Sequence, residues 1–413
     1  MNDPDVVVVG AGIGGGALAT VLARAGLDVL LLERTLEHKD VVRGEWIAPW
    51  GVAETKRLGL YDLYRRAGGH HVTRHVTYDE LLPARQAEAQ TLDLEAMAPG
   101  IGGPLCLGHP TMCNLLDDAA QQAGARLLRG VSRLQVTAGV PPSVEFSQNG
   151  VEHSLRPRWV VGADGRNGVV GQQIGCARHS DPEHHLFSGM LVDGAHEWPE
   201  DLQAIATAGD VNVLAFPQGN GKVRIYMGFA SEQRARLVGR DGPRRFLEAW
   251  RLDCIPYSAA ISRATPISPC ITYPNNDAWV DNPVREGVVL IGDAAGRNDP
   301  ITGQGQSITH RDVRLVRDAL LGESKWEASI FNDYVAERAE RMRRLRIVAR
   351  MTAIRDSEFT EAARLRRAKI HERIIANPTL AITAAAAFVG PDALPAEAFD
   401  DRLINEVMGG PIW

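Results

Sequence analysis

The segment 5–33 restricts the fold of this chain more than any other. Its apolar run Val6–Val9 has the composition of a strand that is covered on both faces. A glycine-rich turn, Gly10–Gly16, follows directly, and apolar residues then recur at helical spacing up to Ala25. The run Asp28–Glu33 has the composition of a second strand. A strand, a tight turn, a helix and a second strand in this order predict a parallel α/β unit.

The turn matches the pattern G-x-G-x-x-G through Gly10, Gly12 and Gly15. The first glycine permits the tight turn, the second lets a pyrophosphate approach the backbone, and the third lets the helix pack close to the strand. The helix N-terminus then offers unpaired N–H groups to phosphates. Glu33 lies eighteen residues beyond Gly15, where a carboxylate binds ribose hydroxyls. We therefore expect a dinucleotide here, with Arg34 beside Glu33 as a further contact.

Charge and cysteine usage exclude several classes of protein. With 45 basic and 51 acidic residues the net charge is −6, which argues against nucleic-acid binding. The five cysteines are scattered without a CxxC pair, which is typical of a reduced, cytoplasmic protein without a zinc site. The acidic N-terminus does not resemble a signal peptide. The apolar run Leu380–Val389 is far shorter than the ~20 residues that span a bilayer. We expect no metal, membrane or nucleic-acid partner.

The middle of the chain has a different pattern. Residues 70–105 and about 180–285 are rich in turn residues and β-prone segments. Within them, Val211–Pro217 and Lys222–Phe229 flank a Gln-Gly-Asn-Gly turn, which predicts a β-hairpin. We therefore expect an antiparallel sheet inserted between segments of the dinucleotide domain. His70-His71 and His184-His185 are expected to be solvated or locally bonded loop histidines.

From about residue 325 onward the pattern is helical. Glu337 and Glu340 are interleaved with arginines, so the expectation is a solvated helix face carrying i, i+4 ion pairs rather than a nucleic-acid stripe. The arginines concerned are Arg338, Arg341, Arg343, Arg344 and Arg346.

Two further motifs lie at predicted strand ends. Residues 160–165 read VVGADG, and residues 288–305 read VVLIGDAAGRNDPITGQG. Together with the N-terminal turn, this triple resembles the para-hydroxybenzoate-hydroxylase-like, single-component FAD-dependent monooxygenases, in the same order and over nearly the whole chain. The resemblance implies a mixed α/β (α+β) fold. Its expected parts are a Rossmann-like FAD-binding domain (1–70, 106–178 and 286–325), an inserted antiparallel β-sheet substrate domain (71–105 and 179–285) and C-terminal helices (326–413).

The same resemblance assigns roles around FAD. Asp293 is expected to bind the ribityl chain, and Pro300 to line the reacting face of the flavin. The turn before residue 305 opens a helix whose N-terminus stabilises the negative charge of the reduced flavin. The implied FAD contacts are Gly10, Gly12, Gly15, Glu33, Arg34, Arg43, His109, Asp164, Gly292, Asp293, Pro300, Gly303, Gln304 and Gly305. His109 fits equally well as a turn histidine before Pro110.

By resemblance, NADPH or NADH reduces the FAD, and a flavin C4a-hydroperoxide formed with O2 hydroxylates a small aromatic substrate. Such a protein works as a monomer or homodimer in the cytoplasm. The expected substrate contacts are Trp46, Trp50, Phe216, Tyr226 and Pro300, although each aromatic also fits a core position. The catalytic base is not identified, and the candidates are His71, His75 and Tyr226.

The sequence also departs from the family pattern. The Asp-Gly motif normally continues with a serine and then an arginine, but those positions hold Gly168 and Gly171. That arginine organises pyrophosphate and nicotinamide-nucleotide contacts in the family, so its loss leaves open whether NAD(P)H or an external reductase reduces the flavin. Gly296 and Ser307 replace a usual histidine and asparagine.

Other chemistries of the same fold stay open. Flavin halogenases carry W-x-W-x-I-P and prenyl reductases carry Y-x-W-x-F-P, whereas the corresponding stretch here is VLAFP, with Leu214 at the tryptophan position. This weighs against both. Epoxidation, Baeyer–Villiger oxidation, a non-enzymatic FAD sensor and a nicotinamide dehydrogenase are the remaining alternatives.

Overall fold

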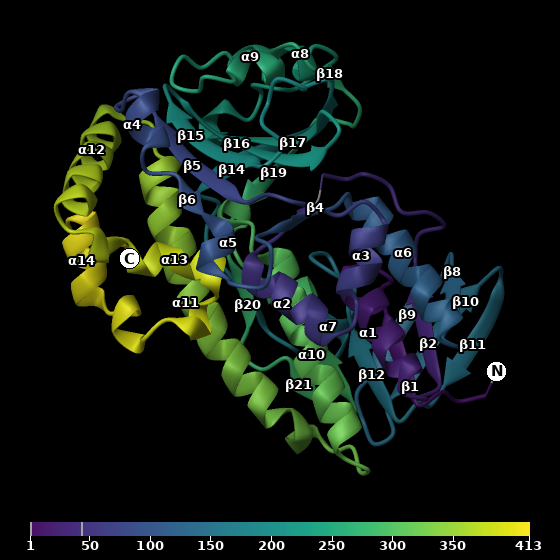
Figure 1. The fold of residues 1–413 in the computed structure, drawn as a ribbon. Coiled ribbons are helices and arrows are strands. Elements are labelled where there is room, and N and C mark those ends of the chain that lie inside the picture. Colours follow the sequence, from purple (N-terminus) through teal and green to yellow (C-terminus); the bar gives the residue numbers. More distant parts are fainter. Residues whose placement is uncertain (1, 43) are drawn as a thin grey trace.

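The computed structural model describes residues 2–42 and 44–413. A six-stranded sheet forms the first layer (Figure 1). Its strands, in spatial order, are β21 (Val284–Arg285), β22 (Val288–Leu290), β12 (Trp159–Gly162), β1 (Val6–Val9), β2 (Val29–Glu33) and β8 (Arg126–Arg129). All pairs are parallel except β21–β22. The predicted strand–helix–strand unit is therefore confirmed, with the central β1 buried along its whole length.

Helices cover one face of this sheet. Helix α1 (Ile13–Arg24) packs between α6 (His109–Gln122) and α10 (Gly305–Gly322). Val6 and Val8 of β1 pack with these helices, whereas Val7 and Val9 face a second apolar cluster on the opposite side. That side is closed by α7 (Val170–Gln173) and by the sheet β9 (Ser132–Thr137), β10 (Ser143–Gln148) and β11 (Val151–Leu155).

An eight-stranded sheet forms the second layer, above the first in Figure 1. Its path is β18 (Thr265–Pro266), β14 (His185–Asp193), β17 (Lys222–Ala230), β16 (Val211–Gly219), β15 (Leu202–Ala208), β5 (Arg74–Asp79) and β6 (Leu92–Asp93), with β19 (Ile271–Asn275) also paired to β14. The pairs are antiparallel except β5–β15. The predicted hairpin is β16–β17.

The two faces of this sheet bury different clusters, because side chains alternate along each strand. The outer face packs against α8 (Gly242–Ala249) and α9 (Ser258–Ser262). The inner face contributes Phe187, Leu214, Phe216 and Tyr226 to a cluster that also contains Ile301 and Ile308 from the first layer. The inner face is therefore the junction between the two layers.

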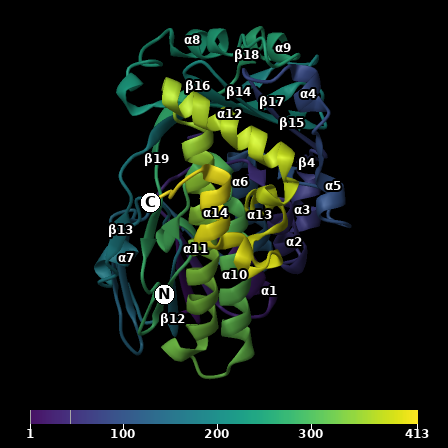
Figure 2. The same cartoon turned by 90° about the vertical axis from the view of Figure 1, so that its left-hand side faces the viewer.

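The C-terminal helices cover one side of this junction (Figure 2). They are α11 (Asn332–Asp356), α12 (Glu361–Ala376), α13 (Ile382–Val389) and α14 (Asp401–Met408). Helix α11 runs beside α10 and contributes Met342 and Leu345 to the junction cluster. Among the described residues, no helix combines the length and apolarity that a membrane span requires.

The expectation of a solvated arginine face on α11 was wrong for two of its five residues. Arg338 and Arg341 are buried, and both reach Asp312 of α10. Arg343 and Arg344 do pair with Glu340, as the i, i+3 and i, i+4 spacings predict. The buried pairs escaped prediction because Asp312 lies on another helix, 26 residues before Arg338.

The histidine pairs also differ from the expectation. His70 and His71 form strand β4 (His70–His71), which pairs with β7 (Leu105–Cys106), and β7 in turn pairs with β3 (Trp46–Ile47). His185 is fully buried at the start of β14. The segment 70–105 is not purely β, since it also contains α4 (Ala84–Glu88) and α5 (Leu94–Met97).

Candidate FAD site and the junction beside it

The glycine turn between β1 and α1 has the geometry that a bound pyrophosphate requires. Gly10 has a φ of +98°, and an added Cβ would lie 2.6 Å from the carbonyl oxygen of Ala163. A Cβ on Gly15 would lie 1.8 Å from the carbonyl oxygen of Gly10, so only glycine permits this helix–strand contact. A Cβ on Gly12 would meet no described atom within 4 Å. The turn is thus tightly packed at Gly10 and Gly15 and open at Gly12, which leaves room for a phosphate at the helix N-terminus.

Glu33 lies at the end of β2, beside this turn. Its Oε2 accepts a hydrogen bond from the Ala11 N–H at 2.8 Å, and its Oε1 accepts from the N–H and hydroxyl of Thr35. Burial opposes ionisation of this carboxyl, but these hydrogen bonds outweigh it and lower the pKa of Glu33. Glu33 is therefore ionised at neutral pH, and its role as an acceptor for ribose hydroxyls stays a prediction. Arg34 follows it as an exposed side chain, and Arg43 lies outside the described residues.

A buried ion cluster holds the turn that carries Asp293. The Gly292 N–H donates to Asp312 at 2.8 Å. Arg338 donates to the carbonyl oxygens of Gly292, Ala295 and Gly296 at 2.9–3.1 Å. The Asp293 carboxylate accepts no hydrogen bond from another described residue. A fixed turn with an available carboxylate suits the binding of a polyol such as the ribityl chain.

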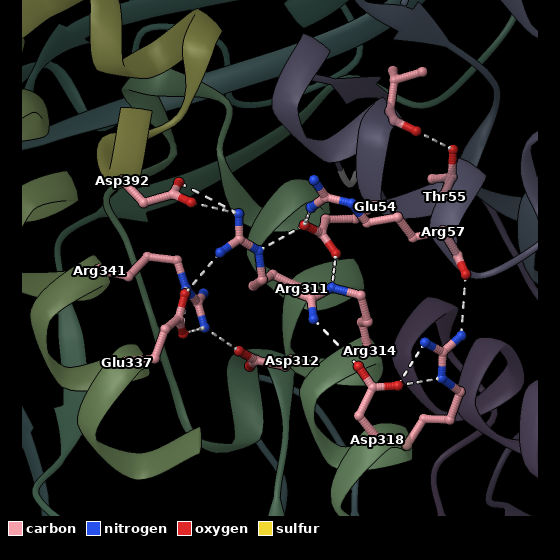
Figure 3. Close-up of polar contacts among 12 residues, drawn as sticks. Glu54, Thr55, Arg57, Arg311, Asp312, Arg314, Asp318, Glu337, Arg341 and Asp392 are labelled. Carbon is pink, nitrogen blue, oxygen red and sulfur yellow. Dashed lines mark hydrogen bonds and ion pairs between the residues drawn. The ribbon is translucent and has the colours of Figure 1, made fainter. Parts of the chain in front are cut away.

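A second ion network fixes the position of α10 (Figure 3). The buried Glu54 of α2 (Pro49–Arg57) binds Arg311 through Oε1 at 2.7 Å and Arg314 through Oε2. Arg311 continues to Glu337 of α11 and to Asp392. Three chain segments, α2, α11 and the segment at Asp392, are therefore tied to the helix whose N-terminus faces the junction.

The N-terminus of α10 begins beside the junction. Gly303, with a φ of +67°, packs against the Trp46 ring, and Gly305 begins the helix. The Gln304 side chain is already occupied: Trp50 Nε1 donates to its Oε1 at 2.8 Å, and its Nε2 donates to the Ala387 carbonyl at 3.1 Å. The Gly303 N–H is also occupied, since it donates to the Pro300 carbonyl at 2.9 Å, whereas the N–H groups of Gln304 and Gly305 donate to no other described residue.

Asp164 organises the second motif. One of its oxygens accepts from the N–H groups of Val169 and Val170, at the start of α7, at 2.6 and 2.9 Å. The other is buried without a partner among the described residues, and burial raises the pKa of Asp164. An orphaned buried acceptor beside the glycine turn is consistent with a ligand that completes the site.

His109 is the first residue of α6, after Gly108. Its backbone N–H donates to Glu45 at 2.8 Å, and its ring lies 3.7 Å from the Cys113 sulfur. Glu45 is buried and also binds the buried Arg224 of β17 with a 2.8 Å contact. This arrangement ties the start of α6 to the second sheet. The role of His109 toward a flavin stays a prediction.

The structure brings the aromatic candidates together. Trp46 and Phe216 have ring centroids 6.0 Å apart, Phe216 and Tyr226 are also 6.0 Å apart, and Phe388 of α13 lies 6.3 Å from Trp46. Trp50 belongs to the same buried cluster. These rings form a mostly buried apolar cluster beside Ile301 and Gly303. We call Trp46, Phe216, Tyr226 and Phe388 the aromatic cluster.

Of the three candidates for a base, His75 and Tyr226 lie at this cluster. Gln203 accepts from Trp46 Nε1 at 2.7 Å and donates to His75 Nδ1 at 3.1 Å. Burial lowers the pKa of His75 to about 4 and raises that of Tyr226 well above its usual value. His71 instead bonds Tyr61 and the Pro104 carbonyl. At neutral pH His75 is therefore uncharged, and Tyr226 keeps its proton.

The sequence reasoning missed a group of buried polar residues beside Pro300. Asp299 caps the turn at Ile301 with a 2.9 Å hydrogen bond, and Asp277 accepts from the Asn298 side chain and the Asp299 N–H. Burial and Asp277 raise the pKa of Asp299 to about 7, and burial raises that of Asp277 to about 6. In the sequence, the polar pair Asn298-Asp299 directly before Pro300 could have indicated this group.

The comparisons with known proteins agree with this geometry. The model of the FAD binding domain family matches residues 3–347, so the chain belongs to that family. The family and the fold confirm the resemblance to para-hydroxybenzoate-hydroxylase-like flavoproteins. The open approach at Gly12, the ionised Glu33 and the available Asp293 fit FAD as the dinucleotide.

The individual relatives are distant. Squalene monooxygenase of Mus musculus is 23% identical over 332 residues, 78% of this chain and 55% of that protein. The chain thus spans about half the length of this relative. Digeranylgeranylglycerophospholipid reductase 1 of Methanococcoides burtonii is 26% identical over 73% of this chain and 71% of that protein. The crystal structure of p-nitrophenol 4-monooxygenase from Pseudomonas putida superposes with a TM-score of 0.75 at 19% identity, covering 98% and 99% of the two chains.

Proposed function

We propose that this protein is an FAD-dependent monooxygenase that uses NADH or NADPH and O2 to hydroxylate a small aromatic substrate. The observation that carries the proposal is the position of the aromatic cluster beside residues 300–305 and the N-terminus of α10. In this proposal residues 71–105 and 179–285 form the substrate domain. The protein acts in the cytoplasm as a monomer or homodimer.

FAD, when bound, supplies the redox chemistry and the activation of oxygen. The chain's own residues bind and orient the reactants. Gly12 and the start of α1 receive the diphosphate, Glu33 the ribose and Asp293 the ribityl hydroxyls. The N–H groups of Gln304 and Gly305 at the start of α10 would be the donors toward the flavin, since a helix N-terminus favours negative charge.

The aromatic cluster supplies an apolar surface for the substrate and excludes water from it. Exclusion matters because water beside a reactive oxygen species favours unproductive release of peroxide. Trp46 is held by Gln203, which is held in turn by His75, so His75 acts as a positioning residue for the indole. Tyr226 keeps its proton at neutral pH and donates a hydrogen bond rather than accepting a proton.

Direct reduction by NAD(P)H draws support from arginines near the second motif. A Cβ at Gly171 would lie 3.2 Å from Leu290, so there is little room for an arginine at this position. Arg178, however, donates to the carbonyl oxygens of Arg166 and Ala294 at 2.6 and 3.4 Å. Burial and the charge of Arg166 lower the pKa of Arg297 to about 10. This concentration of positive charge suits a nucleotide diphosphate.

Anaerobic mixing of the FAD-loaded protein with NADPH, and separately with NADH, tests the proposal. We expect bleaching of the flavin absorbance, and faster bleaching with a suitable phenol present. Admission of oxygen should then give a product carrying one additional oxygen atom, detected by mass spectrometry. No bleaching with either nucleotide, across a panel of phenols and heteroaromatics, would replace the proposal by a partner-reduced enzyme or a sensor. Bleaching without an oxygenated product would indicate that the protein is an oxidase or a reductase.

A further inference from the structure

A continuous chain of polar side chains leads from the turn before Pro300 to the protein surface. His185 Nε2 lies 4.0 Å from Asp299 Oδ1 and 3.0 Å from the Asn275 Nδ2. His185 Nδ1 lies 3.1 Å from His184 Nδ1, and His184 Nε2 lies 3.3 Å from Glu358 Oε1. Each ring nitrogen of both histidines therefore lies beside another polar side chain of this row.

Hydrogen-bond chemistry fixes one direction of donation along this chain. An amide nitrogen only donates, so His185 Nε2 accepts from Asn275 and the proton of the neutral ring resides on Nδ1. His185 Nδ1 then donates to His184 Nδ1, and His184 Nε2 donates to the Glu358 carboxylate. After each histidine has passed on a proton, its N–H lies on the opposite ring nitrogen. Rotation of the Asn275 amide then turns its oxygen toward His185 Nε2–H, and every hydrogen bond along the row donates in the opposite direction. A chain with two such polarities can transmit protons.

The two ends of the chain have opposite environments. Asp299 is only 5% exposed and His185 is not exposed at all. The His184 and Glu358 side chains are 19% and 33% exposed, so the outer end reaches water. The charged or titratable groups facing the inner end are Asp277, His185 and, at longer range, Arg166. Those facing the outer end are His185 and Arg366, which pairs with Glu358.

We propose that Asp299, His185 and His184 form a proton relay between the flavin-facing turn and Glu358 at the surface. The location of its inner end rests on the proposed function, because Pro300 borders the flavin only in that proposal. Each transfer breaks one N–H or O–H bond and forms another, no electrons move, and Glu358 exchanges its proton with water. A small rotation of the His185 ring or one water molecule closes the 4.0 Å step to Asp299.

Burial supports this role for Asp299. It raises the pKa of the carboxyl to about 7, together with the nearby Asp277, so both protonation states are populated at neutral pH. The neighbouring His185 is neutral, because burial lowers its pKa to about 3. A neutral imidazole accepts a proton on one nitrogen while releasing one from the other, which lets it conduct without a lasting charge.

Proton uptake during photoreduction of the FAD-loaded protein tests the relay. Light, a free deazaflavin and EDTA deliver two electrons, and FAD takes up one proton from water as it becomes its anionic reduced form. Oxidation of EDTA also releases protons, but by the same amount per FAD reduced in every variant, so a pH-indicator dye compares proton uptake by wild type, His184→Gln and Glu358→Gln. A glutamine occupies space and hydrogen-bonds but does not exchange protons in this way. We expect proton uptake to slow by about 10- to 100-fold in both variants, with unchanged melting temperature.

His179→Gln is the matched control. His179 also bonds a carboxylate, Asp281 at 2.9 Å, but it is exposed and does not belong to the proposed relay. Added imidazole should restore uptake in His184→Gly and have no effect on wild type, which a purely structural histidine would not show. Wild-type uptake rates in His184→Gln, Glu358→Gln and Asp299→Asn would overturn the relay. The measurement needs no NAD(P)H, oxygen or organic substrate, so it stands even if the hydroxylase proposal fails.

Discussion

Arg338 and Asp312 form a buried ion pair, with Nε and Oδ2 3.0 Å apart, and both side chains also bind the backbone of the turn that presents Asp293. Arg341 binds the other oxygen of Asp312 at 2.7 Å. Asp312 and Arg338 thus bond the backbone groups of the turn after β22, and Arg341 holds Asp312 in place. The stability of the protein and the geometry of the cofactor site therefore depend on the same ions.

Substitution of Asp312→Asn should lower the free energy of unfolding by about 3–5 kcal/mol, because it leaves Arg338 buried without its carboxylate partner, whereas Arg341 keeps Glu337. It should also weaken FAD binding. Urea unfolding and fluorescence titration with FAD measure the two effects. Asp318→Asn, at the solvated end of the same helix, is the control and should cost less than about 1 kcal/mol. Equal losses in the two variants would contradict the role given to the buried cluster.

Two alanine substitutions in the glycine turn should behave differently. Gly15→Ala forces a Cβ toward the Gly10 carbonyl, 1.8 Å away, and should lower the melting temperature of the protein even without FAD. Gly12→Ala meets nothing within 4 Å and should leave the melting temperature of the FAD-free protein unchanged. Its Cβ instead occupies the phosphate approach, so FAD affinity should fall by about tenfold or more. Undiminished FAD binding by Gly12→Ala would place the diphosphate elsewhere.

The buried His310 should lower the free energy of unfolding as the pH becomes acidic. Tyr64 donates to its Nε2 at 2.9 Å, its Nδ1 donates to the Gln306 carbonyl at 2.8 Å, and burial lowers its pKa to about 4. The unfolded chain therefore binds a proton below the usual histidine pKa of about 6.5, whereas the folded chain does not until near pH 4. Stability from this group is present above that range and is lost as the pH falls through it.

His310→Gln removes this proton linkage while keeping a polar side chain. Between pH 6 and pH 4 the unfolding free energies of wild type and His310→Gln should converge by about 1.4 kcal/mol per pH unit. Urea unfolding at several pH values measures the convergence, and all other titrating groups cancel in the difference. Parallel curves would mean that His310 titrates alike in the two states.

Phe388→Leu should uncouple oxygen consumption from hydroxylation, because Phe388 packs on both Trp46 and His75 and shields the aromatic cluster. We expect a severalfold larger share of hydrogen peroxide per NAD(P)H consumed, with an unchanged rate of anaerobic flavin reduction. Phe399→Leu, in the separate core of the C-terminal helices, is the control for nonspecific loosening. An equal peroxide yield from the two variants would remove Phe388 from the site.

Local signals allowed much of the fold to be predicted, but not the contacts that complete the site. The β1–α1–β2 unit and the β16–β17 hairpin follow from periodicity and turn residues within about 30 residues. In contrast, Gln203 joins Trp46 and His75 across 157 and 128 positions of the sequence. Burial of His185 results from β19 and the turn at Asp299, which lie far along the chain. No spacing rule connects such distant residues.

The aromatic cluster has a consequence for the order in which the protein matures during synthesis. Its members run from Trp46 to Phe388, so the ring from α13 leaves the ribosome long after the glycine turn that begins the dinucleotide site. At about 5–20 residues per second this interval lasts on the order of tens of seconds. A nascent chain therefore acquires the glycine turn and Glu33 first, Asp293 and the start of α10 later, and the ring that shields the neighbouring surface from water last. During that interval a captured flavin would stand beside an open junction.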